Sequence, residues 1–246
     1  MKVGILLSVR HKATRFPGKV LKPFGKRNVT EHLLHRLSES ALANTVIMAT
    51  STADGDSVLA DLALANGFTC FRGHPDDKLI RYRDAARAHG LDFVVIVDGD
   101  DPFISVAHID RIIAHSSENG GDYIIVDGLP LGATGFGVSA NALEKICANR
   151  DEEDTEIWGH YFTQNDSYNS VLLTEPDSKL ARPDVRMTLD YPEDYEFFQA
   201  VLSGLAIEGE DAGFVEIMNY LNKHPEIIEI NRDTHEKRQQ ALESKT

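Results

Sequence analysis

The order of apolar and polar segments in the first half of the chain most constrains its fold. Short runs rich in β-branched residues alternate with longer segments whose apolar residues recur at helical spacing. The runs predict strands at 3–9, 45–50, 69–72, 93–98 and 123–126, and the longer segments predict helices at 28–40, 56–66, 78–89 and 106–117. Because strands and helices alternate in this way, we expect an α/β fold with a mostly parallel sheet and helices on both faces.

The pattern loosens from about residue 128, where Gly128, Gly132, Gly135 and Gly137 follow closely on one another. Strands are still predicted at 170–174 and 186–189, and helices at 192–203 and 213–222. No segment has the composition of a linker between two domains. We therefore expect a single domain over 1–230 with an irregular insertion, followed by a polar C-terminal tail over 231–246 whose last few residues fray.

The charge of the chain argues against two classes of partner. The 25 basic and 39 acidic residues give a net charge of −14, whereas nucleic acids and anionic membrane surfaces attract basic proteins. No run approaches the roughly 20 apolar residues of a membrane span. The two cysteines, Cys70 and Cys147, lie far apart in apolar runs, which is typical of reduced thiols. We expect a cytoplasmic protein.

A basic loop follows the first predicted strand. It starts at Ser8 and carries Arg10, Lys12, Arg15 and Lys19. Ligands of open α/β sheets bind beyond the carboxyl ends of the strands, and guanidinium and ammonium groups are suited to phosphate. The loop therefore predicts a phosphate site, with a solvated basic loop as the alternative. It lacks the G-x-x-x-x-G-K-[ST] spacing of a P-loop.

Carboxylates follow two other predicted strands. Asp98, Asp100 and Asp101 come at the end of the apolar run 93–97, and oxygen ligands of this kind suit Mg²⁺. An acidic turn is the alternative interpretation. Asp190 follows the strand predicted at 186–189, and Pro192 then opens a helix. Taken alone, Asp190 is best explained as the N-cap of that helix.

Three segments together resemble a known family. Arg10 to Lys19 matches R-x4-R-[LF]-P-G-K, 98–102 is similar to Q-G-D-x-P, and 186–195 matches R-x-T-x-D-x-P-E-D-[YL]. These motifs resemble those of the cytidylyltransferases that make CMP-activated sugars, which include the 3-deoxy-manno-octulosonate and acylneuraminate enzymes and the spore-coat polysaccharide biosynthesis protein F group. The resemblance spans about residues 3–203. It implies the Rossmann-like nucleotide-diphospho-sugar transferase fold and Mg²⁺-dependent chemistry.

The resemblance also assigns roles to individual residues. It implies phosphate-binding, catalytic roles for Arg10, Arg15 and Lys19, further nucleotide contacts from Ser8, Arg72 and Asp98, Mg²⁺ ligation by Asp100 and Asp190, and substrate contacts from Arg186 and His160. Two alternatives stay open: Arg186 is either a phosphate contact or a structural residue, and His160 either contacts substrate or packs.

The chain departs from the family pattern at three places. Lys12-Ala13 stands where Gly-Ser is usual, Lys78-Leu79-Ile80 stands for V-L-D, and the segment 128–138 resembles an acceptor-side loop without its usual Glu. The implied reaction moves CMP from CTP to a sugar or sugar acid and releases pyrophosphate, for surface polysaccharide or glycoconjugate synthesis by a homodimer. The alternatives are another nucleoside triphosphate, a phosphorylated acceptor, or a catalytically silent homologue that binds a nucleotide or sugar.

Overall fold

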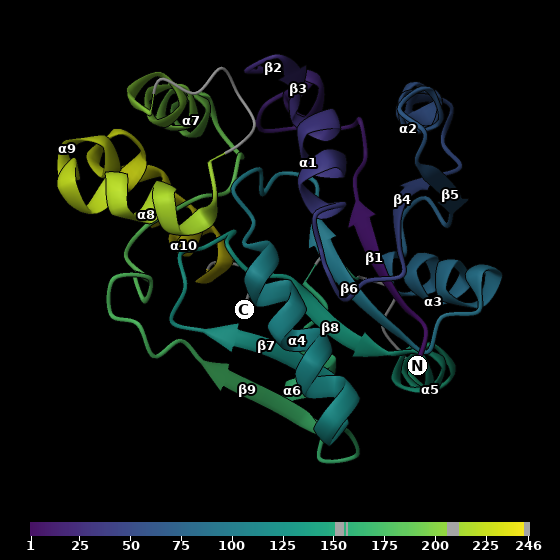
Figure 1. Ribbon diagram of the computed structural model, residues 1–246. Helices are drawn as coiled ribbons and strands as arrows, with labels where there is room; N and C mark the ends of the chain where they lie inside the picture. The colour runs from purple at the N-terminus through teal and green to yellow at the C-terminus, as the bar shows by residue number, and fades with distance from the viewer. Residues whose placement is uncertain (151–154, 156, 206–211, 244–246) are drawn as a thin grey trace.

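The architecture is a seven-stranded sheet between two layers of helices (Figure 1). The computed structural model describes residues 1–150, 155, 157–205 and 212–243. The sheet order is β5-β4-β1-β6-β8-β7-β9, and β8 runs antiparallel to both of its neighbours while the remaining pairs are parallel. This confirms the predicted mostly parallel sheet. The strands are β1 (Val3–Ser8), β4 (Thr45–Ser51), β5 (Thr69–Gly73), β6 (Phe93–Asp98), β7 (Tyr123–Asp127), β8 (Phe136–Ser139) and β9 (Ser170–Thr174), with a small hairpin of β2 (Pro23–Phe24) and β3 (Arg27–Asn28) outside the sheet.

Alternate residues of β1 enter two separate cores. Ile5 and Leu7 pack into one core with Leu33 and Ile109, whereas Leu6 packs into the other with Tyr82. The first core lies under α1 (Val29–Leu37), α2 (Ser57–Ala65), α4 (Val106–Asn119), α7 (Pro192–Gly204), α8 (Phe214–Lys223) and α9 (Pro225–Ile228). The second lies under α3 (Lys78–His89), α5 (Ala140–Asn149) and α6 (His160–Thr163). β1 is buried along its whole length because neighbouring strands and both helix layers cover it.

The second half of the chain departs from the predicted elements. β8, α5 and α6 were not predicted, and β8 follows the glycine-rich loop. Gly137 is needed there, because a Cβ would lie 2.4 Å from Cγ2 of Ile112. The strand predicted at 186–189 is wrong: within the described chain this segment makes only an isolated bridge between Leu131 and Arg186. Its backbone bonds instead to two loops, since Met187 N donates to Leu131 O and Leu189 N donates to Asp100 O.

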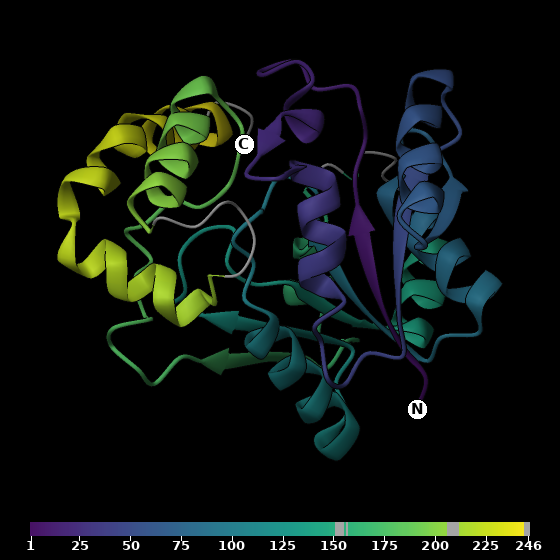
Figure 2. The same ribbon diagram turned by 45° about the horizontal axis from the view of Figure 1, so that its top comes forward.

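The polar tail forms helical structure beside α7 (Figure 2). The 3₁₀ helix η3 (Glu229–Asn231) leads into α10 (Arg232–Glu243), and residues 244–246 of the predicted tail lie outside the described part. Asn231 is buried and donates to the Asp194 carboxylate. The tail therefore starts with a residue that contacts the main body. None of the helices in the described ranges is long and apolar enough to cross a membrane.

Candidate active site

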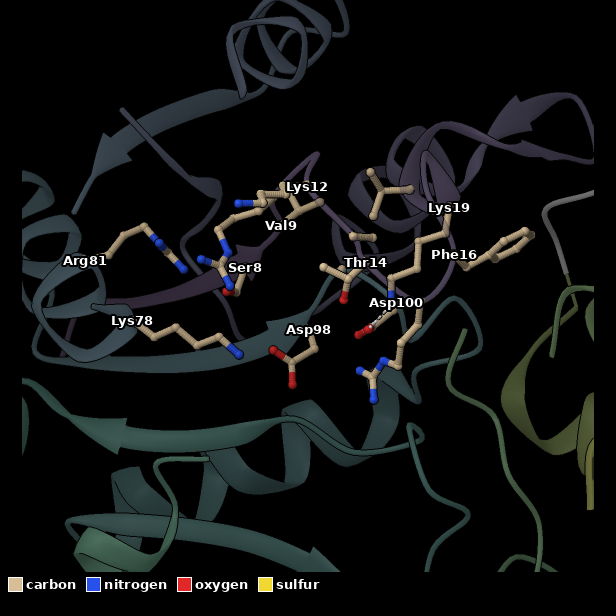
Figure 3. Close-up of a pocket in the computed structure, with 15 residues that line it drawn as sticks. Ser8, Val9, Lys12, Thr14, Phe16, Lys19, Lys78, Arg81, Asp98 and Asp100 are labelled. Atoms are coloured by element: carbon tan, nitrogen blue, oxygen red, sulfur yellow. Dashed lines mark hydrogen bonds and ion pairs between the residues drawn. The ribbon is translucent and has the colours of Figure 1, made fainter. Parts of the chain in front are cut away.

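The ends of β1 and β6 bring the basic loop and the acidic segment together. Ser8, the last residue of β1, is the register partner of Asp98, the last residue of β6. The chain after β6 passes so close to β1 that a Cβ on Gly99 would lie 2.7 Å from Cβ of Val9 and 3.0 Å from O of Ser8. The loop and the end of β6 enclose a cavity of about 240 Å³ (Figure 3).

This first cavity has walls of opposite charge. Six cationic residues line it: Arg10, Lys12, Arg15, Lys19, Lys78 and Arg81. Asp98 and Asp100 line the β6 side. A wall rich in guanidinium and ammonium groups attracts anions, and carboxylates at the opposite side attract a hard cation. The cavity therefore suits a polyphosphate that is bound together with a divalent metal.

Lys19 connects the two acidic segments. Its Nζ donates to Oδ2 of Asp100 at 2.6 Å and to Oδ1 of Asp190 at 3.0 Å. Gly18 precedes it with a φ of 70°, a left-handed conformation that allows the loop to turn into the 3₁₀ helix η1 (Lys19–Leu21). Burial acts to lower the pKa of Lys19, but the charges of Asp100 and Asp190 outweigh burial and raise that pKa above its ordinary value. The ammonium therefore stays charged at neutral pH.

Arg15 reaches the same carboxylate from the solvent side. Its Nη2 donates to Oδ1 of Asp190 at 2.8 Å, and its guanidinium carbon lies 5.7 Å from the ring centroid of Tyr191. The Arg15 side chain is 47% exposed, whereas that of Asp190 is only 1% exposed. Because one side of the Arg15 side chain faces solvent, its guanidinium can change position when a ligand enters the cavity.

A buried network fixes Asp190 from behind. Nη2 of Arg186 donates to Oδ2 of Asp190 at 2.9 Å, and Nε donates to Oδ1 of Asp194 at 2.9 Å. Asp194 also accepts from the backbone N–H groups of Asp190 and Tyr191 and caps α7, whose N-cap residue is Tyr191. Asp190 therefore is not the helix cap, and its carboxylate is directed towards Lys19 and Arg15. The geometry favours the structural alternative for Arg186, which is 2% exposed.

The carboxylates after β6 form a compact oxygen cluster. One oxygen from each of Asp98, Asp100 and Asp101 lies within 4.8 Å of the others. Burial, followed by the charges of Asp100 and Asp98, raises the pKa of Asp101 well above its ordinary value. A divalent cation would relieve this repulsion, and the all-oxygen donor set fits Mg²⁺. Asp190 and Asp100 both form an ion pair with Lys19, so Asp190 lies within reach of the oxygen cluster.

A second cavity, of about 680 Å³, adjoins the first. Both cavities are lined by Thr14, Arg15, Lys78, Asp98 and Asp100. The far wall of the second cavity consists of residues from two loops: Leu129, Pro130, Leu131, Gly132 and Thr134 from the first, and Thr188, Asp190 and Tyr191 from the second. Two ligands that occupy these cavities would therefore meet beside the acidic cluster.

Comparison with known proteins identifies the family. A family model described as cytidylyltransferase matches residues 4–224. The chain belongs to the cytidylyltransferase family. It is thus a nucleotidyltransferase. The spore coat polysaccharide biosynthesis protein SpsF of Bacillus subtilis is similar to it, with 30% identity over 90% of this chain and 94% of that protein.

Solved structures agree with this assignment. The chain is similar to a cytidylyltransferase from Leptospira borgpetersenii with a TM-score of 0.84 and 26% identity, over 93% of this chain and 97% of the other. It shares its fold with a CMP:2-keto-3-deoxy-manno-octonic acid synthetase complexed with CTP, at a TM-score of 0.66 and 13% identity, over 82% of this chain and 99% of the other. The expected Rossmann-like transferase fold is thereby confirmed.

The cytidylyltransferase brings most of the residues named from sequence to the first cavity. Ser8, Arg10, Arg15, Lys19, Asp98 and Asp100 line it. Asp190 lines only the second cavity, and Arg186 lines neither. Arg72 and His160 also lie outside both cavities. Arg72 donates to the carbonyl oxygens of Ser51 and Ala53, away from both cavities. His160 lies in α6, and its ring packs against that of Tyr161 rather than lining either cavity.

Sequence reasoning missed Lys78, Arg81 and Tyr191 as lining residues. Lys78 carried a signal, because it is a cation where the family pattern has an apolar residue. Trp158 is buried against Tyr82 and packs in the second core.

Proposed function

We propose that the protein transfers CMP from CTP to a sugar or sugar acid and releases pyrophosphate. The observation that carries this proposal is the shared wall of the two cavities, where Asp98 and Asp100 face both. A triphosphate in the first cavity and an acceptor in the second would place the α-phosphorus and the attacking oxygen at this wall. Catalysis then consists mainly of positioning and charge stabilisation.

The reaction needs no covalent intermediate with the protein. The acceptor oxygen forms a bond to the α-phosphorus, the bond from that phosphorus to the oxygen that bridges to the β-phosphate breaks, and the acceptor proton is released to solvent. Arg15 and Lys19 are placed to neutralise the charge of the departing pyrophosphate. Lys19 would exchange a carboxylate for a phosphate oxygen in that step.

We propose that Mg²⁺ is the metal and that Asp100 and Asp190 hold it, with Asp98 close by. When bound, a metal ion at these carboxylates would neutralise phosphate charge and align the triphosphate. Support comes from the oxygen cluster of Asp98, Asp100 and Asp101 and from the convergence of Asp100 and Asp190 on one point, where the Lys19 ammonium supplies the positive charge.

The finer assignments are proposals as well. We infer a cytoplasmic homodimer whose product serves surface polysaccharide or glycoconjugate synthesis; the name of the SpsF relative supports that pathway class. Another nucleoside triphosphate, a phosphorylated acceptor and a catalytically silent homologue are the competing functions. The lack of the usual loop Glu favours an acceptor that differs from that of the spore-coat branch.

The test incubates the protein with Mg²⁺, 3-deoxy-manno-octulosonate and each of the four ribonucleoside triphosphates in turn. Released pyrophosphate and the mass of the activated sugar are measured, and a panel of other sugar acids, neutral sugars and sugar phosphates follows. We expect turnover with CTP and at least one sugar or sugar acid. Absence of pyrophosphate release from every triphosphate, together with no thermal shift by CTP and Mg²⁺, would leave the silent homologue as the better description.

A further inference from the structure

The start of the basic loop lines the first cavity at every position but one. Within the fully described stretch from Ser8 to Phe16, His11 alone does not line that cavity (Figure 3). Arg10 and Lys12, on either side of His11, both line it. Like charges this close together repel each other, so other groups must hold the loop if it is to keep one conformation.

Asp56 holds the loop at His11. Oδ1 of Asp56 accepts from His11 N at 2.7 Å, and Asp56 is 3% exposed and lines neither cavity. A carboxylate that accepts from a backbone N–H makes a charge-assisted hydrogen bond, which is stronger than a neutral one. The next four amides, those of residues 12–15, donate to no acceptor in the described part of the chain. The Asp56 bond is therefore the last backbone anchor before the segment that faces the cavity.

A turn after β4 places Asp56 behind the loop. Ser51 is the last residue of β4, and its Oγ donates to Oδ2 of Asp56 and accepts from Ala53 N at 3.1 Å. Arg72 of β5 donates from Nε to O of Ser51 at 3.0 Å and from Nη2 to O of Ala53 at 2.8 Å. β4 pairs with β1, so the turn lies beside the basic loop. Arg72, which the sequence predicts as a nucleotide contact, instead stabilises the turn that carries Asp56.

We propose that Asp56 is a positioning residue for triphosphate binding: it fixes the His11 amide so that Arg10 and Lys12 line the cavity before a ligand arrives. This role rests on the proposed function, because it requires that the basic loop binds the triphosphate. A loop that already has its bound conformation loses less conformational entropy when the ligand binds, so the affinity is higher. Asp56 acts through the loop and does not touch the ligand itself.

The charge and the hydrogen bond of Asp56 have opposite effects on phosphate affinity. A carboxylate near the site repels a polyanion, so removal of the charge alone should strengthen binding. Loss of the bond to His11 N should weaken binding, because the loop can then leave its position. Asp56→Ala removes both, whereas Asp56→Asn removes the charge and keeps an oxygen acceptor for His11 N. The direction of the change in affinity therefore separates positioning from electrostatics.

The experiment measures the dissociation constant of inorganic tripolyphosphate for the full-length protein by calorimetry with Mg²⁺ present. We expect Asp56→Ala to bind about 10-fold more weakly than wild type, and Asp56→Asn to bind at least as tightly as wild type. In assays of pyrophosphate release, Asp56→Ala should raise the KM for CTP by a similar factor with little change in kcat. A variant that is merely unstable would instead lose kcat and keep its KM.

Two further variants separate the hydrogen bond from charge and from folding. Asp54→Ala removes the same charge from an exposed position in the same 3₁₀ helix, η2 (Asp54–Asp56), and should not weaken tripolyphosphate binding. Ser51→Ala leaves the net charge unchanged but removes the hydroxyl that donates to Asp56, so it should weaken binding by roughly threefold. Circular dichroism and melting temperatures check that each variant is folded. If Asp56→Ala does not fold, Ser51→Ala decides.

Two results would overturn the proposal. If folded Asp56→Ala, or Ser51→Ala in its place, binds tripolyphosphate as tightly as wild type or more tightly, the loop keeps its position without this carboxylate. If Asp56→Asn binds as weakly as Asp56→Ala, the retained acceptor does not hold the loop. Failure of the proposed function gives a different result: wild type would release no pyrophosphate from any triphosphate, whereas the tripolyphosphate affinities of the variants could still differ as expected.

Discussion

Arg186 and Asp190 form a fully buried ion pair, with Nη2 of Arg186 2.9 Å from Oδ2 of Asp190. The same guanidinium binds Asp194, so one arginine holds two carboxylates at the start of α7. The outer oxygen of Asp190 then remains for Lys19 and Arg15. Arg186 therefore orients Asp190, which lines the second cavity, although Arg186 itself lines neither cavity.

Replacing Arg186 by Met should destabilise the protein strongly. Two buried carboxylates would lose the guanidinium that they share, and breaking a buried pair in this way costs about 3–5 kcal/mol. For a chain of this size we expect the melting temperature to fall by on the order of 10 °C. The matched control is Arg182→Met, because Arg182 pairs with the exposed Asp184 and such pairs contribute about 1 kcal/mol or less. If the melting temperatures of the two variants fell equally, the buried pairs of Arg186 would contribute no more stability than a surface pair.

Replacing Asp100 by Asn should remove most of the turnover and little of the stability. The Asp100 side chain is 25% exposed, and Lys19 keeps its second partner, Asp190. We expect kcat to fall by about 100-fold or more if Asp100 holds the metal, and the same loss when the wild type is treated with EDTA. Pyrophosphate release across a Mg²⁺ titration measures this. Asp166→Asn, at an exposed position, serves as the control. Wild-type kinetics for Asp100→Asn would show that Asp100 does not bind the metal.

Acid should destabilise the protein through His32. This residue is 2% exposed, and its Nε2 lies 2.8 Å from the carbonyl oxygen of Pro102, just after the acidic cluster. Burial, aided by the charge of Arg36, lowers the pKa of His32 to about 3. The unfolded chain takes up this proton near pH 6.5, so between these values the unfolded state binds more protons. The free energy of unfolding therefore falls as the pH is lowered, by up to about 1.4 kcal/mol per unit from this group.

Urea denaturation at pH 7, 6, 5 and 4 measures the pH dependence of stability. In His32→Gln, which retains a side-chain donor for Pro102, the contribution of the histidine to the slope should disappear. His224→Gln is the control, because His224 is on the surface, with its side chain 43% exposed. An unchanged slope in His32→Gln would show that other groups dominate the acid transition.

A methyl group on Gly132 should impair the second cavity. Its φ is 90°, and a Cβ there would lie 2.5 Å from O of Met187 and 2.7 Å from Oδ1 of Asp101. Gly128 has a similar φ of 87°, but its Cβ would meet only Cβ of Ala181 at 3.8 Å. Gly132→Ala and Gly128→Ala therefore share the backbone strain, and only the first adds crowding.

We expect Gly132→Ala to lose about 1–3 kcal/mol more stability than Gly128→Ala. It should also raise the KM of the acceptor while leaving the CTP dissociation constant near the wild-type value, because the first cavity is not lined by Gly132. Melting temperatures and kinetics at saturating CTP measure both effects. Identical behaviour of the two variants would mean that the loop moves freely away from Asp101.

Local patterns predicted most of the sheet because a strand buried on both faces must be apolar along its length. The strand predicted at 93–98, which is buried in this way, has the observed bounds. The partly exposed edge strand at 170–174 and the helix at 78–89 also have the predicted bounds. β8 was not predicted because it lies in a glycine-rich segment. Glycine is required at 137 because Ile112 of α4 approaches the backbone closely. The segment 186–189 has the composition of a strand, yet loops rather than strands supply its backbone partners.

By itself the sequence determined the sheet, the family motifs, and the three segments that supply Lys19, Asp100 and Asp190. It could do so because apolar periodicity and charge clusters are properties of neighbouring residues. Only the tertiary structure decided that Arg186 faces away from the cavities and that Arg72 is turned to carbonyl groups at and just after the end of β4. These outcomes depend on which buried acceptors each arginine can reach, and the strands and loops that supply those acceptors come together only when the chain folds.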